Sequence, residues 1–119
     1  MARLVDQDRF AAYTNALNNW DFKGYIHPTL NKQANDFVRV KLGITFDQLK
    51  WHMYNYVQNG GEIDEQPERR PEWSHLYNFH YDLRFYINNI HTYIETRLIY
   101  TPPFVPDEPR ILVVNVHDR

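Results

Sequence analysis

The feature that most constrains the fold is a two-residue alternation of apolar and polar side chains across residues 76–100. An alternation of this period is typical of β-strands with one buried face. Asn88 and Asn89 interrupt it at its middle, and asparagine tolerates the positive φ angles of a two-residue hairpin turn better than most residues. The sequence therefore predicts an antiparallel hairpin in which Ile87 lies opposite Ile90.

This register divides the hairpin into an apolar face and a polar face. The apolar face pairs Phe85 with Thr92, Leu83 with Ile94, Tyr81 with Thr96 and Phe79 with Leu98. The polar face pairs His80 with Arg97, Asp82 with Glu95, Arg84 with Tyr93 and Tyr86 with His91. We expect the apolar face to cover the core and the polar face to point outward.

Helical patterns occupy the first half of the chain. Apolar residues at three- and four-residue spacing predict a helix over residues 7–20 with Asp6 as its N-cap. A second helix is expected from a Thr29 cap to Leu42, with Gly43 ending it. The apolar stripe expected on the first helix consists of Phe10, Tyr13, Leu17 and Trp20.

The start of a third helix is the best specified of the three. Thr45 and Gln48 have the spacing of a capping box, and Ile44 and Leu49 occupy the two positions of a hydrophobic staple. Residues 59–61, Asn-Gly-Gly, supply the conformational freedom that ends a helix. This helix is expected to bury Leu49, Met53, Tyr56 and Val57.

The remaining segments complete the predicted architecture. Residues 21–28 and 102–109 read as loops, and residues 62–74 as an exposed loop with at most one short edge strand. Residues 110–117 are apolar on both faces, which is typical of a central strand. We expect one α+β domain over residues 1–119, with about three N-terminal helices packed on a C-terminal antiparallel sheet of three to four strands. Its parts are a helix and loop (1–28), a helical pair (29–60) and the sheet (61–119).

Composition limits the classes of function. The 119 residues include no cysteine, which excludes disulfides and thiolate chemistry. No apolar run approaches the roughly 20 residues that span a bilayer, and the first residues do not form a signal peptide. We therefore expect a cytoplasmic protein with no membrane partner. A formal charge of −2 argues against coating of nucleic acid but leaves room for local arginine contacts.

The polar face carries the groups that metal-independent cleavage of RNA requires, namely a base, an acid and a cation. Glu95 or a neutral histidine is the candidate base, and His80, His91 or His117 the candidate acid. The candidate phosphate clamps are Arg84 and Arg97, and Tyr86 or Tyr93 is the candidate for stacking on a base. The same charges also suit ordinary cross-strand ion pairs, so a purely structural role stays open.

No metal or other cofactor is expected. None of the six histidines has the spacing that places two metal ligands on one helix face. The chain also contains no glycine-rich phosphate loop, nucleophile elbow or dinucleotide fingerprint. The expected partners are RNA and a cognate inhibitor or target protein.

Three segments carry a resemblance to known proteins: the basic helix end at residues 38–44, and the strands at residues 95–100 and 110–117. In order and chemistry, residues 29–119 resemble the small bacterial ribonuclease toxins of the barnase, colicin and RelE class, including the MqsR type. The resemblance implies an acid, a base and an arginine on the sheet face. Glu95, Arg97 and His117 would take these roles, with His80 and Arg84 beside them and Tyr86, His91 and Tyr93 binding substrate.

A non-catalytic reading stands beside the enzymatic one. A slightly acidic, aromatic-rich small domain also resembles a protein inhibitor, such as an immunity protein, an antitoxin or a phage-encoded blocker of a host enzyme. Aromatic residues are enriched at binding hot spots. In this reading the interface anchors would be Tyr86, Tyr93, Trp73 and Phe104.

Overall fold

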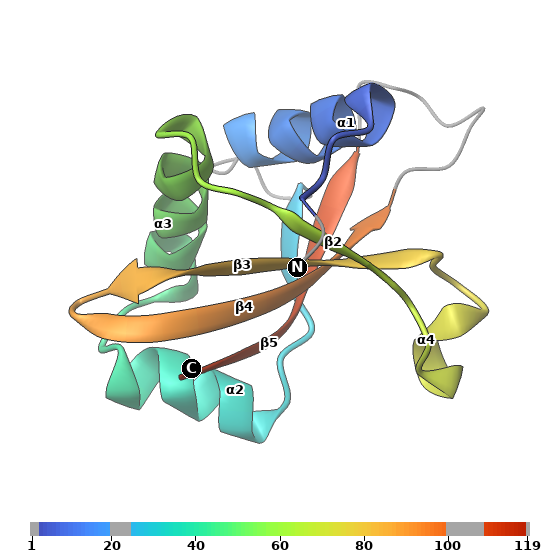
Figure 1. The fold of residues 1–119 in the computed structure, drawn as a ribbon. Helices are drawn as coiled ribbons and strands as arrows, with labels where there is room; N and C mark the ends of the chain where they lie inside the picture. Colours follow the sequence, from blue (N-terminus) through green and yellow to red (C-terminus); the bar gives the residue numbers. More distant parts are fainter. Residues whose placement is uncertain (1–2, 20–24, 100–108, 119) are drawn as a thin grey trace.

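The predicted hairpin forms part of a five-stranded sheet in the computed structural model, which describes residues 3–19, 25–99 and 109–118 (Figure 1). The strand order is β1-β5-β4-β3-β2. β1 runs parallel to β5, and the other neighbours are antiparallel. The strands are β1 (Ile26–Pro28), β2 (Asp64–Pro67), β3 (Phe79–Ile87), β4 (Ile90–Ile99) and β5 (Arg110–Asp118).

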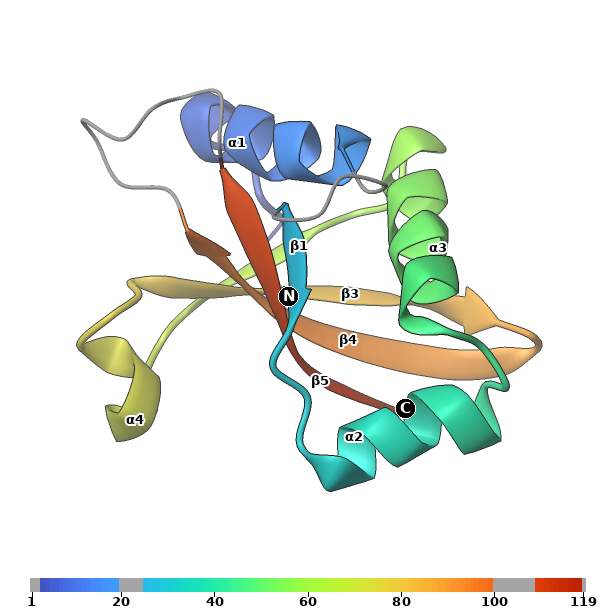
Figure 2. The same cartoon turned by 180° about the vertical axis from the view of Figure 1, so that it is seen from behind.

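Helical segments lie around this sheet. They are α1 (Gln7–Asn18), α2 (Lys32–Asp36), its π-helical continuation η1 (Phe37–Lys41), α3 (Phe46–Gln58) and α4 (Pro71–Ser74). In the view from behind, α1, α3 and α2 surround the strands on three sides, and α4 lies at the end of the sheet away from α3 (Figure 2). The fold class is therefore α+β, as predicted, but the sheet is mixed rather than purely antiparallel, because the fifth strand, β1, pairs in parallel with β5; the short helix α4 is also additional.

The hairpin register is confirmed. Asn88 and Asn89 adopt φ angles of 50° and 66°, and the ladder between β3 and β4 runs from Ile87–Ile90 to Tyr81–Thr96. The two outermost predicted pairs, His80–Arg97 and Phe79–Leu98, lie beyond this ladder. On the opposite edge of β3, His80 and Phe79 pair with Gln66 and Pro67 of the edge strand β2.

The helix starts are only partly as predicted. Asp6 caps α1 as expected, but Phe10 is exposed, and the buried face consists of Ala12, Tyr13, Ala16 and Leu17. Asn31 caps α2 rather than Thr29, whose backbone N–H donates to the Val113 carbonyl and continues the β1–β5 pairing. Trp20 lies outside the described residues.

The third helix begins as the sequence predicts. The Thr45 hydroxyl accepts from the Gln48 backbone N–H, and the Gln48 side chain accepts from the Thr45 N–H, which is a capping box. Ile44 and Leu49 are both buried, as a hydrophobic staple requires. Tyr56 and Val57 are only partly buried, and Tyr56 stacks on Phe85 of β3 with ring centroids 4.4 Å apart.

Two predicted loops contain structure that the pattern does not indicate. The segment 21–28 ends in the strand β1, which lies at the edge of the sheet with Ile26 buried. The sequence did not indicate this strand, because three residues are too few to display a periodic pattern. Residues 62–74 do contain the short edge strand β2, but Asp64 and Glu68 are buried, so this loop is not exposed as expected. The predicted loop 102–109 lies outside the described residues except for its last residue.

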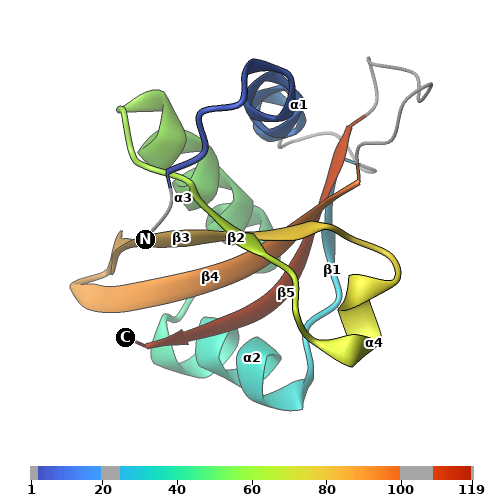
Figure 3. The same cartoon turned by 45° about the vertical axis from the view of Figure 1, so that its right-hand side comes forward.

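A single core lies between the helices and the sheet. β5 lies between β1 and β4, and its residues Ile111, Val113 and Val116 are buried in the core with Leu83 and Ile94. Figure 3 shows how strongly the strands twist relative to each other, with β5 crossing behind β4 toward α2. No helix in the described part of the chain has the length and apolar character needed to cross a membrane.

Candidate functional site

The polar face of the hairpin is more buried than the alternation predicts. Arg97 is 0% exposed, Asp82 2% and Glu95 5%. The cause is the segment around α4, because Trp73 lies over the Arg97 guanidinium, 5.1 Å from it. The expectation that this face simply points into solvent is therefore wrong for its central residues.

Arg97 is the centre of a buried ion cluster. Its Nη2 lies 2.6 Å from Oε2 of Glu68 and 2.8 Å from Oε2 of Glu95, and its Nη1 donates to the Thr96 carbonyl oxygen at 3.1 Å. Arg70 also binds Glu95, and its backbone N–H donates to Glu68. Two arginines and two carboxylates thus neutralise each other, which is the condition under which charges are stable inside a fold.

Arg84 belongs to a neighbouring cluster. Its Nη1 donates to Oδ2 of Asp64 at 2.7 Å, and its Nη2 lies 3.7 Å from Oδ2 of Asp82. Its guanidinium lies over the Tyr93 ring, 5.0 Å from the centroid. Arg84 keeps part of its side chain exposed, so it is the predicted phosphate clamp that a ligand can still reach.

Two histidines flank the Asp82–Tyr93 pair. Nδ1 of His80 lies 2.9 Å from Oδ1 of Asp82, and Tyr93 lies close enough to the same carboxylate for each group to shift the pKa of the other. On the other side of Tyr93, the His117 ring stacks at a centroid distance of 4.7 Å. The structure therefore joins His80, Asp82, Tyr93 and His117 into one chain of contacts across β3, β4 and β5.

Burial sets the protonation of the central pair. It raises the pKa of Asp82, against the hydrogen bond from His80, which acts in the opposite direction. Burial also raises the pKa of Tyr93, and the neighbouring Asp82 carboxylate raises it further. Tyr93 is therefore a neutral hydroxyl group at physiological pH.

The outer end of the polar face carries an aromatic pair. Tyr86 is 69% exposed and stacks on His91, with ring centroids 4.7 Å apart and planes 18° apart. Arg84 lies on the same strand between this pair and Asp82, so Tyr86 and His91 border the histidine site. An exposed ring of this kind is a suitable surface for a nucleobase.

The structure separates the predicted site residues into two groups. His80, Arg84, Tyr93 and His117 come together, with Tyr86 and His91 beside them. Glu95 and Arg97 lie in the buried ion cluster, where neither reaches a ligand while that cluster is intact, so their predicted catalytic contact is corrected.

The sequence pattern missed the partners that come from outside the hairpin. Asp64 of β2 binds Arg84, while Glu68 and Arg70 hold Arg97 and Glu95. These residues lie in a polar segment without a clear period, where only the density of charge distinguishes them. Among the described residues, no group of three or more histidines and carboxylates is arranged to hold a metal ion.

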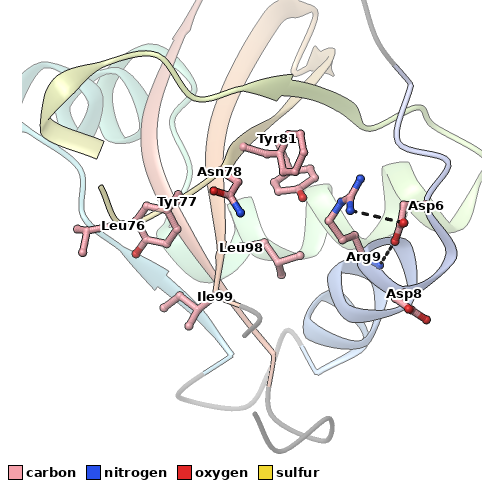
Figure 4. Close-up of a pocket in the computed structure, with 10 residues that line it drawn as sticks. Asp6, Asp8, Arg9, Leu76, Tyr77, Asn78, Tyr81, Leu98 and Ile99 are labelled. Carbon is pink, nitrogen blue, oxygen red and sulfur yellow. Dashed lines mark hydrogen bonds and ion pairs between the residues drawn. The ribbon is translucent and has the colours of Figure 1, made fainter. Parts of the chain in front are cut away.

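A pocket of the described structure is lined by other residues than this site (Figure 4). It has a volume of about 570 Å³ and lies between the start of α1 and the ends of β3 and β4. Arg9 in its wall is bound to Glu65 at 2.7 and 3.0 Å and lies over Phe79. It is lined by Asp6, Asp8, Arg9, Leu76, Tyr77, Asn78, Phe79, Tyr81, Leu98 and Ile99, which include no predicted site residue.

Comparisons with known proteins give no match to a family model, to a curated protein or to a solved structure. The geometry of the site is therefore the basis for the functional argument.

Proposed function

We propose that this domain is a metal-independent ribonuclease in which His80 and His117 act as the acid–base pair. The observation that carries the proposal is that His80 hydrogen-bonds Asp82 while His117 stacks on Tyr93, a neighbour of that carboxylate. Two histidines that act as base and acid suffice for cleavage by the 2′-hydroxyl group, and the proposal requires both rings to reach one phosphate group. The resemblance of residues 29–119 to bacterial ribonuclease toxins, in element order and residue chemistry, leads to the same proposal.

Asp82 fixes the orientation in which His80 acts as the base. When Nδ1–H of His80 donates to Asp82, the neutral ring carries its free electron pair on Nε2. This nitrogen takes the proton of the 2′-hydroxyl group, and the 2′-oxygen forms a bond to phosphorus. The bond from phosphorus to the 5′-oxygen breaks, and protonated His117 gives that oxygen its proton. The products are a 2′,3′-cyclic phosphate and a 5′-hydroxyl end.

Arg84 and the imidazolium of protonated His117 are proposed to stabilise the negative charge that develops on the phosphate oxygens in the transition state. Arg84 is partly exposed and already oriented by Asp64 and the Tyr93 ring. Preorganised donors of this kind stabilise charge that develops during the reaction. Arg97 and Glu95 are assigned a supporting role in this proposal, because their cluster fixes β4 beneath the site. Tyr86 and His91 are proposed to stack on a base next to the scissile phosphate.

The experiment measures cleavage of a mixed-sequence RNA in EDTA by the wild type and by His80→Ala, His117→Ala and His75→Ala. General acid–base catalysis contributes roughly 10² to 10⁴ in rate. Losses of this size are expected for His80→Ala and His117→Ala. His75 is exposed, and its Nδ1 lies 3.3 Å from the Pro71 carbonyl oxygen, outside the proposed site, so His75→Ala is the matched control and is expected to keep full activity.

Several outcomes contradict the ribonuclease proposal. Wild-type protein without cleavage at any concentration, or activity that EDTA abolishes, would reject it. Equal activity in all three variants would show a contaminating nuclease. End-group analysis adds a further check, because the mechanism requires a 2′,3′-cyclic phosphate in the product.

A second candidate is a protein-binding domain without catalysis. The observation that favours it is that Arg84 and Arg97 are both engaged by carboxylates, while Tyr86 is 69% exposed. Exposed tyrosines are frequent anchors at interfaces. If this reading holds, Tyr86→Ala weakens capture of a defined partner, whereas His80→Ala and His117→Ala leave it unchanged.

A further inference from the structure

A second pocket, on the helical side of the molecule, lies between η1 and the start of α3. Its volume is about 450 Å³. The walls combine apolar side chains with the Arg39 guanidinium and the polar side chains of Asn35, Thr45 and Gln48. Thr45 and Gln48 are occupied with each other in the capping box, so Arg39 is the charged group that the pocket offers. The apolar lining is formed by Leu30, Val38, Ile44 and Phe46.

The π-helical turn of η1, which forms one wall of this pocket, has two buried residues and three exposed residues between them. The Leu42 N–H donates to the Phe37 carbonyl oxygen at 2.9 Å, which closes a π-helical turn, and both Val38 and Leu42 are buried. The three residues between them, Arg39, Val40 and Lys41, are all exposed, Val40 at 81%. π-Helical turns often occur at functional sites.

The cations of this segment are not neutralised from within the fold. Neither Arg39 nor Lys41 forms an ion pair with a carboxylate of the described residues, whereas Lys32 of the adjoining α2 is paired with Asp36 at 2.9 Å. Of these two cations, Arg39 lines the apolar pocket, and Lys41 lies two residues further along the same helical turn. The complementary ligand has an apolar side chain next to an acidic group.

We propose that this surface binds an acidic peptide segment of a partner protein, with an apolar side chain of that segment in the pocket and a carboxylate on Arg39. A phosphate group alone would satisfy Arg39 but would leave the apolar pocket unfilled. A peptide that combines apolar and acidic side chains therefore fits this surface better than a small anion. This inference is independent of RNA cleavage.

The test is an NMR titration of the full isotope-labelled chain with a capped five-residue peptide of alternating aspartate and leucine. The expected result is a set of amide shifts confined to residues 30–48. The control peptide has asparagine in place of aspartate, and it is expected to bind at least fivefold more weakly, since each exposed ion pair contributes a factor of a few.

Variants locate the site. Arg39→Gln changes an exposed side chain, so the fold is preserved, and it is expected to weaken binding of the acidic peptide roughly fivefold. Lys32→Gln removes a cation of the same helical segment that does not line the pocket, and it leaves the affinity unchanged. Shifts on the strands instead of residues 30–48, equal binding of both peptides, or a stronger response of residues 30–48 to a single-stranded RNA oligonucleotide would each overturn the proposal.

Discussion

At the scale of residues, the feature that most changes the interpretation of the polar face is the burial of Arg97. An arginine that is fully buried retains its charge only if carboxylates compensate it, and Glu68 and Glu95 do so at 2.6 and 2.8 Å. The sequence alternation indicated which residues share this face. It did not indicate their burial, because Glu68 and Trp73 come from a segment without periodicity.

Glu68→Gln is expected to destabilise the fold by about 3 kcal/mol, because removing one partner of a buried ion pair leaves an uncompensated charge. Urea unfolding followed by circular dichroism measures the change. Glu72→Gln, on the exposed surface of α4, is the matched control and should change the free energy of unfolding by less than about 0.5 kcal/mol. Equal, small effects of the two substitutions would show that the cluster does not depend on Glu68.

For the histidines as well, the contacts within the hairpin were predictable from the sequence, whereas the contact that depends on another strand was not. The register placed His80 next to Asp82 on one face and put Tyr93 in the neighbouring row, both of which the structure confirms. His117 was a candidate for its place at a strand end, but its contact with Tyr93 depends on the pairing of β4 with β5. That pairing includes a shift between Glu95 and Thr96, which no local pattern in the sequence predicts.

At the scale of elements, the hairpin turn shows why the register was predictable. Both turn residues have positive φ, and Asn88 also donates from its side chain to the Leu42 carbonyl oxygen at 2.9 Å. The turn therefore holds the tip of the hairpin against the end of η1. β1 was missed because a three-residue strand is held by pairing with β5 rather than by its own pattern.

Substitutions at Asn89 test the turn geometry. Asn89→Gly is expected to keep or slightly raise the stability, because glycine adopts positive φ without strain. Asn89→Ala is expected to lower it by about 1 kcal/mol, because a Cβ atom is unfavourable in the left-handed region. Thermal unfolding of both variants measures the difference, and an alanine variant as stable as the glycine variant would contradict the assigned turn.

At the scale of the whole molecule, three tyrosines connect the layers of the fold, of which Tyr13 and Tyr81 are buried and Tyr93 is half-buried. The Tyr13 hydroxyl on α1 lies 2.8 Å from the Thr96 hydroxyl on β4, Tyr81 packs on the Tyr13 ring, and Tyr93 lies near Asp82 on the other face. Burial raises the pKa of all three above the ordinary value of 10.0. Above pH 10, the hydroxyl groups of these tyrosines therefore stay protonated in the folded state, whereas they ionise in the unfolded chain.

The free energy of unfolding is therefore expected to fall as the pH rises above 10. In that range the unfolded state binds fewer protons than the folded state, which gives stability a negative slope against pH. Denaturant unfolding at a series of pH values measures the slope, and tyrosinate absorbance follows ionisation. Tyr13→Phe removes one of the three groups and should flatten the decline; an unchanged slope in this variant would show that Tyr13 does not contribute.

The position of β5 has a consequence for how the chain is made. Residues 110–118 are the last strand of the described chain, yet they lie between β1 and β4 in the sheet. During synthesis on the ribosome, β1 therefore cannot form its pairing with β5 until residues 110–118 have emerged from the exit tunnel. His117 arrives with the same strand, so the proposed acid–base pair cannot assemble on a nascent chain that lacks it.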